Sequence, residues 1–366
     1  MGIHAHLSGQ TAESDEIMVD LMNIAVGLVV GFLGTRDSQP ALALILSQLE
    51  DGAPQEESIS NRGRGPIPIA DNFLISLRRL PFSSQGVEAW EEGSWEVGGT
   101  LQWSSSIADG ENPFFRIDGE ALALVAALKY GVTPWFRVGL SVPVRLRMAG
   151  MLDGFTDGFH ELFGLPPGAS QRYPNGEIHV EITQAGGSRF EDSQTRADLG
   201  NLVLSAWVDG TEGNEWLPAA MVGLDLGIPS STGDELAGDD GVSFQVSLHL
   251  SKRIVGGLLV HLFGAVAWYG DESLGEIRTE DKRLFGGVAI EWEISSATSF
   301  LIHAEWRGPL FSHGNDRLTL PSFVYSLGVK TGISDRLELQ FAIVENELSY
   351  HNSADFGVQI GVQFSN

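Results

Sequence analysis

The feature that most constrains the fold is a side-chain alternation with a period of two residues. Residues 356–364 read Phe-Gly-Val-Gln-Ile-Gly-Val-Gln-Phe, so the apolar side chains share one face and the glycines and glutamines share the other. In a soluble sandwich the apolar face would form the core, whereas in a transmembrane barrel it would face lipid. One strand does not decide between these folds, so the number of such segments and their connections matter.

About twelve segments of this kind follow one another along the chain. The third is informative, because its apolar residues alternate with Arg137, Ser141, Arg145 and Arg147. The predicted strands are 94–104, 120–130, 135–148, 199–208, 219–228, 242–251, 258–268, 285–293, 300–307, 323–331, 336–344 and 356–364. An even number near twelve lies within the range of bacterial outer-membrane barrels.

The predicted connections alternate in length, which separates a membrane barrel from a soluble sandwich. Short turns are expected at 131–134, 209–215, 252–256, 294–298 and 332–335. Long polar loops are expected at 107–113, 149–198, 229–241, 269–283, 308–322 and 345–355. This alternation is typical of outer-membrane barrels, with turns in the periplasm and loops outside. The sequence therefore predicts an all-β protein, a transmembrane antiparallel up-and-down β-barrel of about 12 strands in the bacterial outer membrane.

Composition excludes several other classes of protein. The mean hydropathy is +0.02, and the apolar run 24–33 is too short for a membrane-spanning helix, which needs about 20 residues. The formal net charge of −26 argues against a nucleic-acid partner, because phosphates require a basic surface. Cysteine is absent, which fits a chain that crosses the periplasm.

Two regions are expected along the chain. Residues 1–64 read as an N-terminal extension, a signal or disordered segment followed by a linker, and residues 65–366 as the barrel. The prolines of Gly-Pro-Ile-Pro-Ile at 65–69 predict extended backbone. Residues 72–77 are then expected to lie along or inside the barrel mouth.

The longest predicted loop carries a motif that resembles a known family. It reads Leu-Asp-Gly-Phe-Thr-Asp-Gly-Phe-His-Glu-Leu-Phe-Gly-Leu-Pro over 152–166 and Gln-Arg-Tyr-Pro-Asn-Gly over 171–176. With residues 65–69 and Gly-Leu-Asp-Leu-Gly-Ile-Pro-Ser at 223–230, it resembles a proteobacterial outer-membrane family, domain of unknown function 3187. The resemblance covers roughly residues 65–366. It implies an outer-membrane barrel and supplies no activity or catalytic residue.

A short amphipathic helix is expected within this loop, because its phenylalanines recur at helical spacing. Its apolar face would pack over the barrel mouth or rest in the outer leaflet, or the helix would gate entry to the lumen. Acidic and histidine side chains also lie one turn apart on it, but such residues are usually solvated, so no metal site is predicted. The gate candidates are Phe155, Asp157, Phe159, His160, Glu161 and Phe163.

The positions predicted to face the lumen collect charged residues. The candidates are Glu96, Arg137, Arg145, Arg147, Glu291, Glu293, His303, Glu305 and Glu338. They form either a polar interior whose charges pair with one another, or a permeation path with arginines opposite glutamates. Twelve strands leave either a narrow channel or a filled core, so both interpretations stay open.

The expected role is the passage or binding of a small-molecule solute, gated by the 149–198 loop. One alternative is a structural or adhesive barrel whose acidic loops bind cations or lipopolysaccharide, and another is an outer-membrane lipid hydrolase. No enzyme is predicted, because His249, His261 and His303 fall on the lumen parity and no Gly-x-Ser-x-Gly motif is present. The expected partners are membrane lipids, lipopolysaccharide and the solute. No cofactor, metal or nucleic acid is expected.

Overall fold

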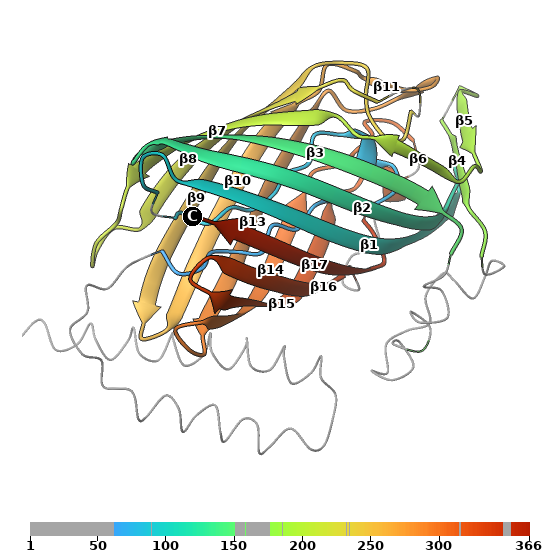
Figure 1. Ribbon diagram of the computed structural model, residues 1–366. Coiled ribbons are helices and arrows are strands. Elements are labelled where there is room, and N and C mark those ends of the chain that lie inside the picture. The colour runs from blue at the N-terminus through green and yellow to red at the C-terminus, as the bar shows by residue number, and fades with distance from the viewer. Residues whose placement is uncertain are drawn as a thin grey trace, which may run out of the picture. The chain divides into compact units, whose positions relative to one another are not determined.

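The computed structural model of the protein describes residues 62–88, 90–150, 158, 176–184, 186–231, 233, 235–314, 316–346 and 353–366. All of them except residue 158 belong to one compact unit. In this unit twelve long strands close into a single antiparallel barrel (Figure 1). No helix among the described residues is long and apolar enough to cross a membrane.

Each barrel strand pairs with its two neighbours, and the last strand pairs with the first. At that seam Thr100 lies opposite Gly361 and Trp103 opposite Val358. Closure satisfies the backbone N–H and C=O groups that lipid could not. The barrel strands are β1 (Trp95–Glu111), β2 (Phe114–Thr133), β3 (Phe136–Met148), β7 (Leu202–Thr211), β8 (Ala219–Ile228), β9 (Ser243–Val255), β10 (Leu258–Trp268), β13 (Lys282–Glu293), β14 (Thr298–Arg307), β15 (Ser322–Ser334), β16 (Leu337–Glu345) and β17 (Phe356–Ser365). The predicted closed antiparallel β-barrel of about twelve strands is confirmed.

The outer face of the barrel is apolar. On β17, Ile360, Val362 and Phe364 are 55%, 45% and 41% exposed, whereas Gln359 on the inner face is completely buried. Apolar side chains exposed around a closed barrel are what a lipid environment requires. The alternation in the sequence therefore sorts lipid-facing from lumen-facing residues, as predicted.

Short turns join the strands at one end, here the turn end, and longer connections join them at the other, the loop end. The predicted long loop at 107–113 is wrong. There β1 and β2 continue as one hairpin to Glu111 and Phe114. Pairing persists because Phe115 and Ile117 also pair with β4 and are buried at the loop end.

The described part of the predicted 149–198 loop adds three short strands at the loop end. They are β4 (His179–Thr183), β5 (Arg189–Asp192) and β6 (Arg196–Leu199). β4 pairs with β2 and β5, and β6 pairs with β3. The predicted helix and its gate candidates Phe155, Asp157, Phe159, His160, Glu161 and Phe163 lie outside the described residues. Other loops contain the hairpin β11 (Ser273–Leu274) and β12 (Ile277–Arg278) and the short helix α4 (Asp316–Thr319).

A segment that precedes β1 runs inside the barrel (Figure 1). This segment, residues 62–88, is called the plug. It starts at the turn end, where the Arg64 side chain donates to the Ser296 carbonyl at 2.8 Å. It reaches the loop end with the 3₁₀ helix η1 (Ser76–Arg78) and returns to the turn end, where the amide of Gly93, beyond the plug, donates to the Gly131 carbonyl near the end of β2. The plug is therefore a hairpin with both limbs in the lumen.

The two limbs of the plug touch at a pair of glycines. A β-carbon built on Gly65 would lie 2.5 Å from the α-carbon of Gly86, and Gly65 has a φ of +70°. Only glycine tolerates both the close approach and the positive φ. Farther along, Ser84 Oγ donates to the Ile67 carbonyl at 3.1 Å and ties the limbs together.

The tip of the plug forms a hydrophobic core with the loops. Phe73, Leu74, Ile75 and Leu77 are buried there. They belong to one cluster with side chains of β2, β4 and three loops, which are Phe115, Ile117, Ala121, Val180, Ile182, Leu236, Leu274, Ile277, Leu310, Phe311 and Leu318. This cluster is called the cap. Full burial of a large apolar side chain contributes about 1.5–3 kcal/mol, so the cap holds the loops firmly on the plug tip.

Candidate functional site

The first limb of the plug is held near the turn end by a buried carboxylate. Glu291 accepts the backbone N–H groups of Arg64 at 2.9 Å and Gly65 at 3.0 Å. His261 Nε2 lies 3.0 Å from the same carboxylate, and Ser299 Oγ donates to it at 2.6 Å. Hydrogen bonds to a charged acceptor are stronger than neutral ones, so this contact fixes where the plug enters the lumen.

Farther in, side chains of the barrel wall bind the plug backbone. The Ile67 N–H donates to His303 Nε2 at 3.2 Å, and Gln359 Nε2 donates to the Pro68 carbonyl at 3.0 Å. Buried backbone groups need hydrogen-bond partners, and these side chains supply them to an extended segment that lies in no sheet. The inner wall thus recognises the plug as a strand-like ligand.

Four charged side chains are buried together between the plug and strands β13 and β14. Asp71 of the plug accepts from Arg283 at 2.9 Å and lies 3.3 Å from Arg307. Arg307 also donates to Glu305 at 2.9 Å. All four are at most 6% exposed. The two positive and two negative charges balance. Asp71 of the plug therefore offsets part of the free-energy cost of burying Arg283 and Arg307.

Two consecutive arginines anchor the plug tip to the loops. Arg78 pairs with the Asp271 carboxylate at 2.5 Å, and Arg79 donates to the Asp271 carbonyl at 2.5 Å. Arg79 also donates to Thr279, and its guanidinium lies 4.5 Å from the centre of the Tyr269 ring. This group is called the tip clamp. It joins the plug to the loop between β10 and β13.

The tip clamp should keep its strength until the solution is strongly acidic. Burial raises the pKa of Asp271, but the Ser273 amide and the Arg78 guanidinium outweigh it, so its pKa lies below the ordinary 3.8. A carboxyl whose pKa falls on folding contributes stability above its unfolded pKa and loses it as the pH drops through the folded value. We expect hydrogen exchange at residues 73–79 to be faster in Asp271→Asn than in wild type at neutral pH and down to about pH 4.

The same comparison contains its own control. Below pH 3.8 the wild-type carboxyl takes up a proton as the pH passes its lowered pKa, and the two exchange rates should converge. Titrating groups that share no partner with Asp271 act equally in both proteins and cancel. Equal exchange rates at neutral pH would show that Asp271 does not hold the tip.

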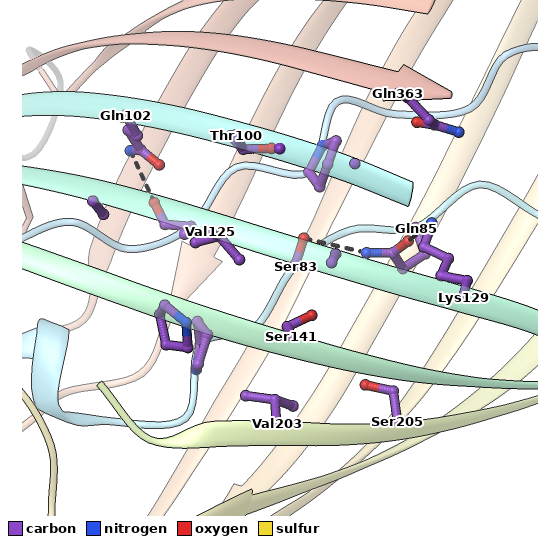
Figure 2. A pocket seen from close by; sticks show the side chains of 18 of the residues that line it. Ser83, Gln85, Thr100, Gln102, Val125, Lys129, Ser141, Val203, Ser205 and Gln363 are labelled. Carbon is purple, nitrogen blue, oxygen red and sulfur yellow. Dashed lines mark hydrogen bonds between the residues drawn. The ribbon is translucent and has the colours of Figure 1, made fainter. Parts of the chain in front are cut away.

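The plug does not fill the whole lumen. A cavity of about 180 Å³ lies between the plug and the inner wall, and its lining residues come from β1, β2, β3, β7, β8, β9, β16 and β17. One water needs only about 10–15 Å³ of such space. In Figure 2, Thr100, Ser141 and Ser205 of the wall and Ser83 of the plug surround it. The neutral polar lining residues are Asn72, Ser83, Gln85, Thr100, Gln102, Ser141, Ser205, Ser247, Gln340, Gln359 and Gln363.

A chain of polar side chains crosses the turn end of this cavity. Gln363 donates to Glu96, Glu96 pairs with Lys129 at 2.9 Å, and Lys129 donates to Gln85 of the plug at 3.3 Å. These four residues are called the crossbar. Gln363 also lines an open cavity of about 590 Å³ at the β13–β14 and β15–β16 turns. The crossbar therefore separates the inner cavity from the turn end.

The structure disperses the predicted lumen residues among different partners. Glu96 and Arg145 line the cavity. Glu291 and His303 bind the plug backbone, and Glu338 pairs with Arg64 of the plug at 2.7 Å. These last three come together around the first limb of the plug.

The other predicted residues meet partners away from the cavity. Arg137 stacks near Trp90 and Trp207, at 5.1 and 5.7 Å from the ring centres. Arg147 pairs with Asp192 of β5 at 3.1 Å, and Glu305 pairs with Arg307. Glu293 is part-exposed at the turn end, where it pairs with Arg253. The arginines of β3 therefore do not face a glutamate wall across open space, because the plug lies between them.

From the sequence, residues 72–77 were expected along or inside the barrel mouth, and they form the plug tip, but the rest of the plug and its cavity residues Ser83 and Gln85 were missed. One signal was available, because a water-filled lumen does not favour large apolar side chains. Lumen-facing positions nevertheless carry Trp207, Met221, Leu259, Phe263, Phe285 and Leu301. Most of these cluster with plug residues, which are Ile67, Ile69, Leu80, Phe82 and Val87.

A group with metal-ligand chemistry lies on the β4–β5 hairpin. One possible ligand atom each from His179, Glu181 and Glu191 lies within 4.8 Å of the others. Arg189 contacts both carboxylates, at 2.9 Å and 2.8 Å. The arginine already compensates the acidic pair, so this group needs no metal.

A serine, a histidine and a glutamate also form a chain inside the barrel. Ser251 Oγ lies 2.8 Å from His261 Nδ1, and His261 Nε2 lies 3.0 Å from Glu291. All three are at most 1% exposed, and Glu291 accepts the plug amides. No histidine of the twelve described barrel strands lies on the outer face. This chain holds the plug and meets no lipid.

Comparison with known sequences places the chain in a family. The profile of the family described as "Protein of unknown function (DUF3187)" matches residues 54–365. The chain is a DUF3187 protein. The resemblance predicted from the loop motif is therefore confirmed. No curated protein sequence matches this DUF3187 protein.

Solved structures of similar fold are outer-membrane barrels. The COG4313 outer membrane channel from Pseudomonas putida F1 superposes with a TM-score of 0.53 at 15% identity, over 76% of the DUF3187 chain and 98% of that chain. The NanC porin gives a TM-score of 0.42 at 9% identity, over 74% and 98% of the two chains. The fold and the apolar outer face place the DUF3187 barrel in the bacterial outer membrane. In outer-membrane barrels the turn end faces the periplasm and the loop end the exterior.

Proposed function

We propose that this barrel is a channel or binding barrel for a small solute and that the plug keeps it closed. The supporting observation is the cavity of about 180 Å³ beside the plug. Protein interiors are normally packed without voids of this size. A lumen that served only as scaffold would gain stability from filling it. Polar groups line the cavity on the wall side and the plug side alike, as a solute path requires.

Passage requires the plug to move. On the periplasmic side, among the described residues, the crossbar side chains lie between the cavity and the open cavity of about 590 Å³ at the turns. On the outer side the cap seals the lumen with packed apolar groups. A side-chain barrier opens by rotamer changes, whereas the cap opens only when the plug tip leaves it. The plug tip is therefore the gate that limits passage. Gating by the 149–198 loop and contact with lipopolysaccharide stay predictions.

A disulfide that locks the plug to the wall tests this role. The Leu80 β-carbon lies 3.7 Å from the place of a β-carbon on Gly227 of β8, which suits a disulfide. The chain has no cysteine of its own. We expect the oxidised Leu80→Cys/Gly227→Cys variant to lose solute uptake in a liposome-swelling assay, by about tenfold or more, and to regain it on reduction.

A matched control uses the same cysteine on β8. Ser243 Cβ lies 3.5 Å from the place of a β-carbon on Gly227, so Gly227→Cys/Ser243→Cys joins β8 to β9 and leaves the plug without a covalent bond to the wall. This second disulfide should leave uptake unchanged. Equal uptake by the oxidised and the reduced Leu80→Cys/Gly227→Cys variant would contradict gating by the plug. Absence of uptake in wild type would favour a structural or adhesive barrel.

A further inference from the structure

We infer that the cavity beside the plug is a binding site for a small, neutral, hydroxylated solute of the polyol or sugar class. The inference rests on the proposed solute role of the lumen. It comes from the cavity lining alone, which combines carbonyl acceptors without a donor, hydroxyl groups and charged groups that already have partners within the protein.

Two buried carboxamides carry the argument. Gln340 of β16 is 7% exposed and Gln359 of β17 is completely buried, and both line the cavity. Their Oε1 atoms have no hydrogen-bond partner among the described residues. The two strands are neighbours in the barrel, and both glutamines lie on the lumen face. A buried carbonyl oxygen without a donor is unfavourable, so this wall calls for a ligand that donates hydrogen bonds.

Other lining groups both donate and accept. Thr100 and Ser141 of the wall and Ser83 of the plug present hydroxyl groups around the cavity (Figure 2). Apolar Val125 and Val203 lie among them. A polyol or a sugar matches this lining, because its hydroxyls donate to carbonyls and exchange bonds with hydroxyls, while its C–H groups contact the valines.

Three charged lining groups are acidic, and each already has partners within the protein. Asp71 pairs with Arg283 and Arg307, and Glu96 pairs with Lys129. The Asp225 carboxylate on β8 accepts hydrogen bonds from Ser205 on the neighbouring strand β7 at 2.5 Å and from Gln245 on the neighbouring strand β9 at 3.0 Å. A cationic solute would therefore lose its hydration without gaining a free countercharge.

Both basic lining groups are held by hydrogen bonds within the protein, and Lys129 also has a carboxylate partner. Lys129 is held by Glu96 and Gln85 in the crossbar. Arg145 turns to the loop end, where it donates to the Ala237 carbonyl at 2.5 Å. An anionic solute would have to displace these contacts. The site thus selects against charge of either sign.

Calorimetric titration of the full-length protein in detergent tests this site. The neutral probes are glycerol, myo-inositol and D-glucose, and the charged probes are glutamate and lysine. We expect at least one neutral probe to bind saturably and neither charged probe to bind. Gln340→Leu/Gln359→Leu should weaken binding about tenfold, because it removes two acceptors. Gln194→Leu, at an exposed loop position, is the matched control and should bind like wild type.

A second variant separates loss of the site from loss of the fold. Thr100→Val keeps the side-chain volume and removes one hydroxyl, so it should also weaken binding while the barrel unfolds at the wild-type temperature. Absence of binding by all three neutral probes, binding of a charged probe at equal affinity, or undiminished binding by the double variant would overturn the inference. Uptake that responds to the disulfide lock without any neutral binding would leave the gating role standing and overturn this site. Binding of a neutral probe without any solute uptake would support this site and contradict the gating role.

Discussion

Deletion of residues 66–85, with Gly65 joined directly to Gly86, should turn the closed barrel into a conducting one. The two glycines already touch, with a built β-carbon of Gly65 2.5 Å from the Gly86 α-carbon, so the new peptide bond spans almost no distance. The deletion removes both limbs and leaves every barrel strand intact. Twelve strands enclose a lumen between that of a filled eight-stranded barrel and that of an open porin, so we expect conductance in planar bilayers to rise on the order of tenfold or more.

The control for this deletion is the removal of residues 153–166, which carry the gate candidates of the longest loop. If the plug is the barrier, this loop deletion should change conductance much less than deletion of the plug. The opposite ranking would make the loop the gate. Silence of the plug deletion, in a barrel that still shows heat-modifiable migration, would show that the wall side chains alone close the lumen.

The second large effect should come from Asp71→Ala, which leaves Arg283 and Arg307 buried beside a single carboxylate. Breaking a buried, charge-balanced cluster by removing one partner typically costs about 3–5 kcal/mol. Because Asp71 belongs to the plug, the cost should fall on plug docking and leave the barrel folded. Hydrogen exchange of residues 66–85 should report a local opening free energy lower by about that amount.

Asp109→Ala is the matched control for this change. Asp109 pairs with Arg317 at 3.4 Å on the loop end, where the arginine side chain is 51% exposed. An exposed pair of this kind contributes about 0–1 kcal/mol, so plug exchange should hardly change. Similar effects of the two substitutions would mean that Asp71 is not a docking residue.

The strands were predictable because their information is local. The alternation on β17, with Ile360 and Val362 outside and Gln359 inside, needs only the two-residue period of a strand. The exception at 107–113 also has a physical reason. Polar residues there predicted a loop, but pairing of Phe115 with Ile182 of β4 extended the hairpin beyond the barrel.

The plug was not predictable in the same way, because an irregular segment has no period. Its contacts join positions far apart in the sequence, such as Arg64 with Glu291 and Asp71 with Arg283, 227 and 212 residues apart. Charged side chains were predicted to face the lumen from their positions in the strand alternation. Their partners could not be predicted, because several of those partners belong to the plug, which folds back into the barrel. Besides the expectation for residues 72–77, apolar lumen positions such as Phe263 were a local sign that something fills the barrel.

The plug enters and leaves the lumen at the same end of the barrel. Both of its limbs meet the turn end, so the plug does not pass through the closed ring of strands from one end to the other. The pairing of β1 with β17 can therefore form before or after the plug docks in the lumen, and the plug can leave the lumen while β1 and β17 stay paired. Assembly in the membrane and the proposed control of passage are thus two separable events. Assembly depends on the backbone hydrogen bonds between neighbouring strands, whereas the control of passage depends on the side-chain contacts between the plug and the wall.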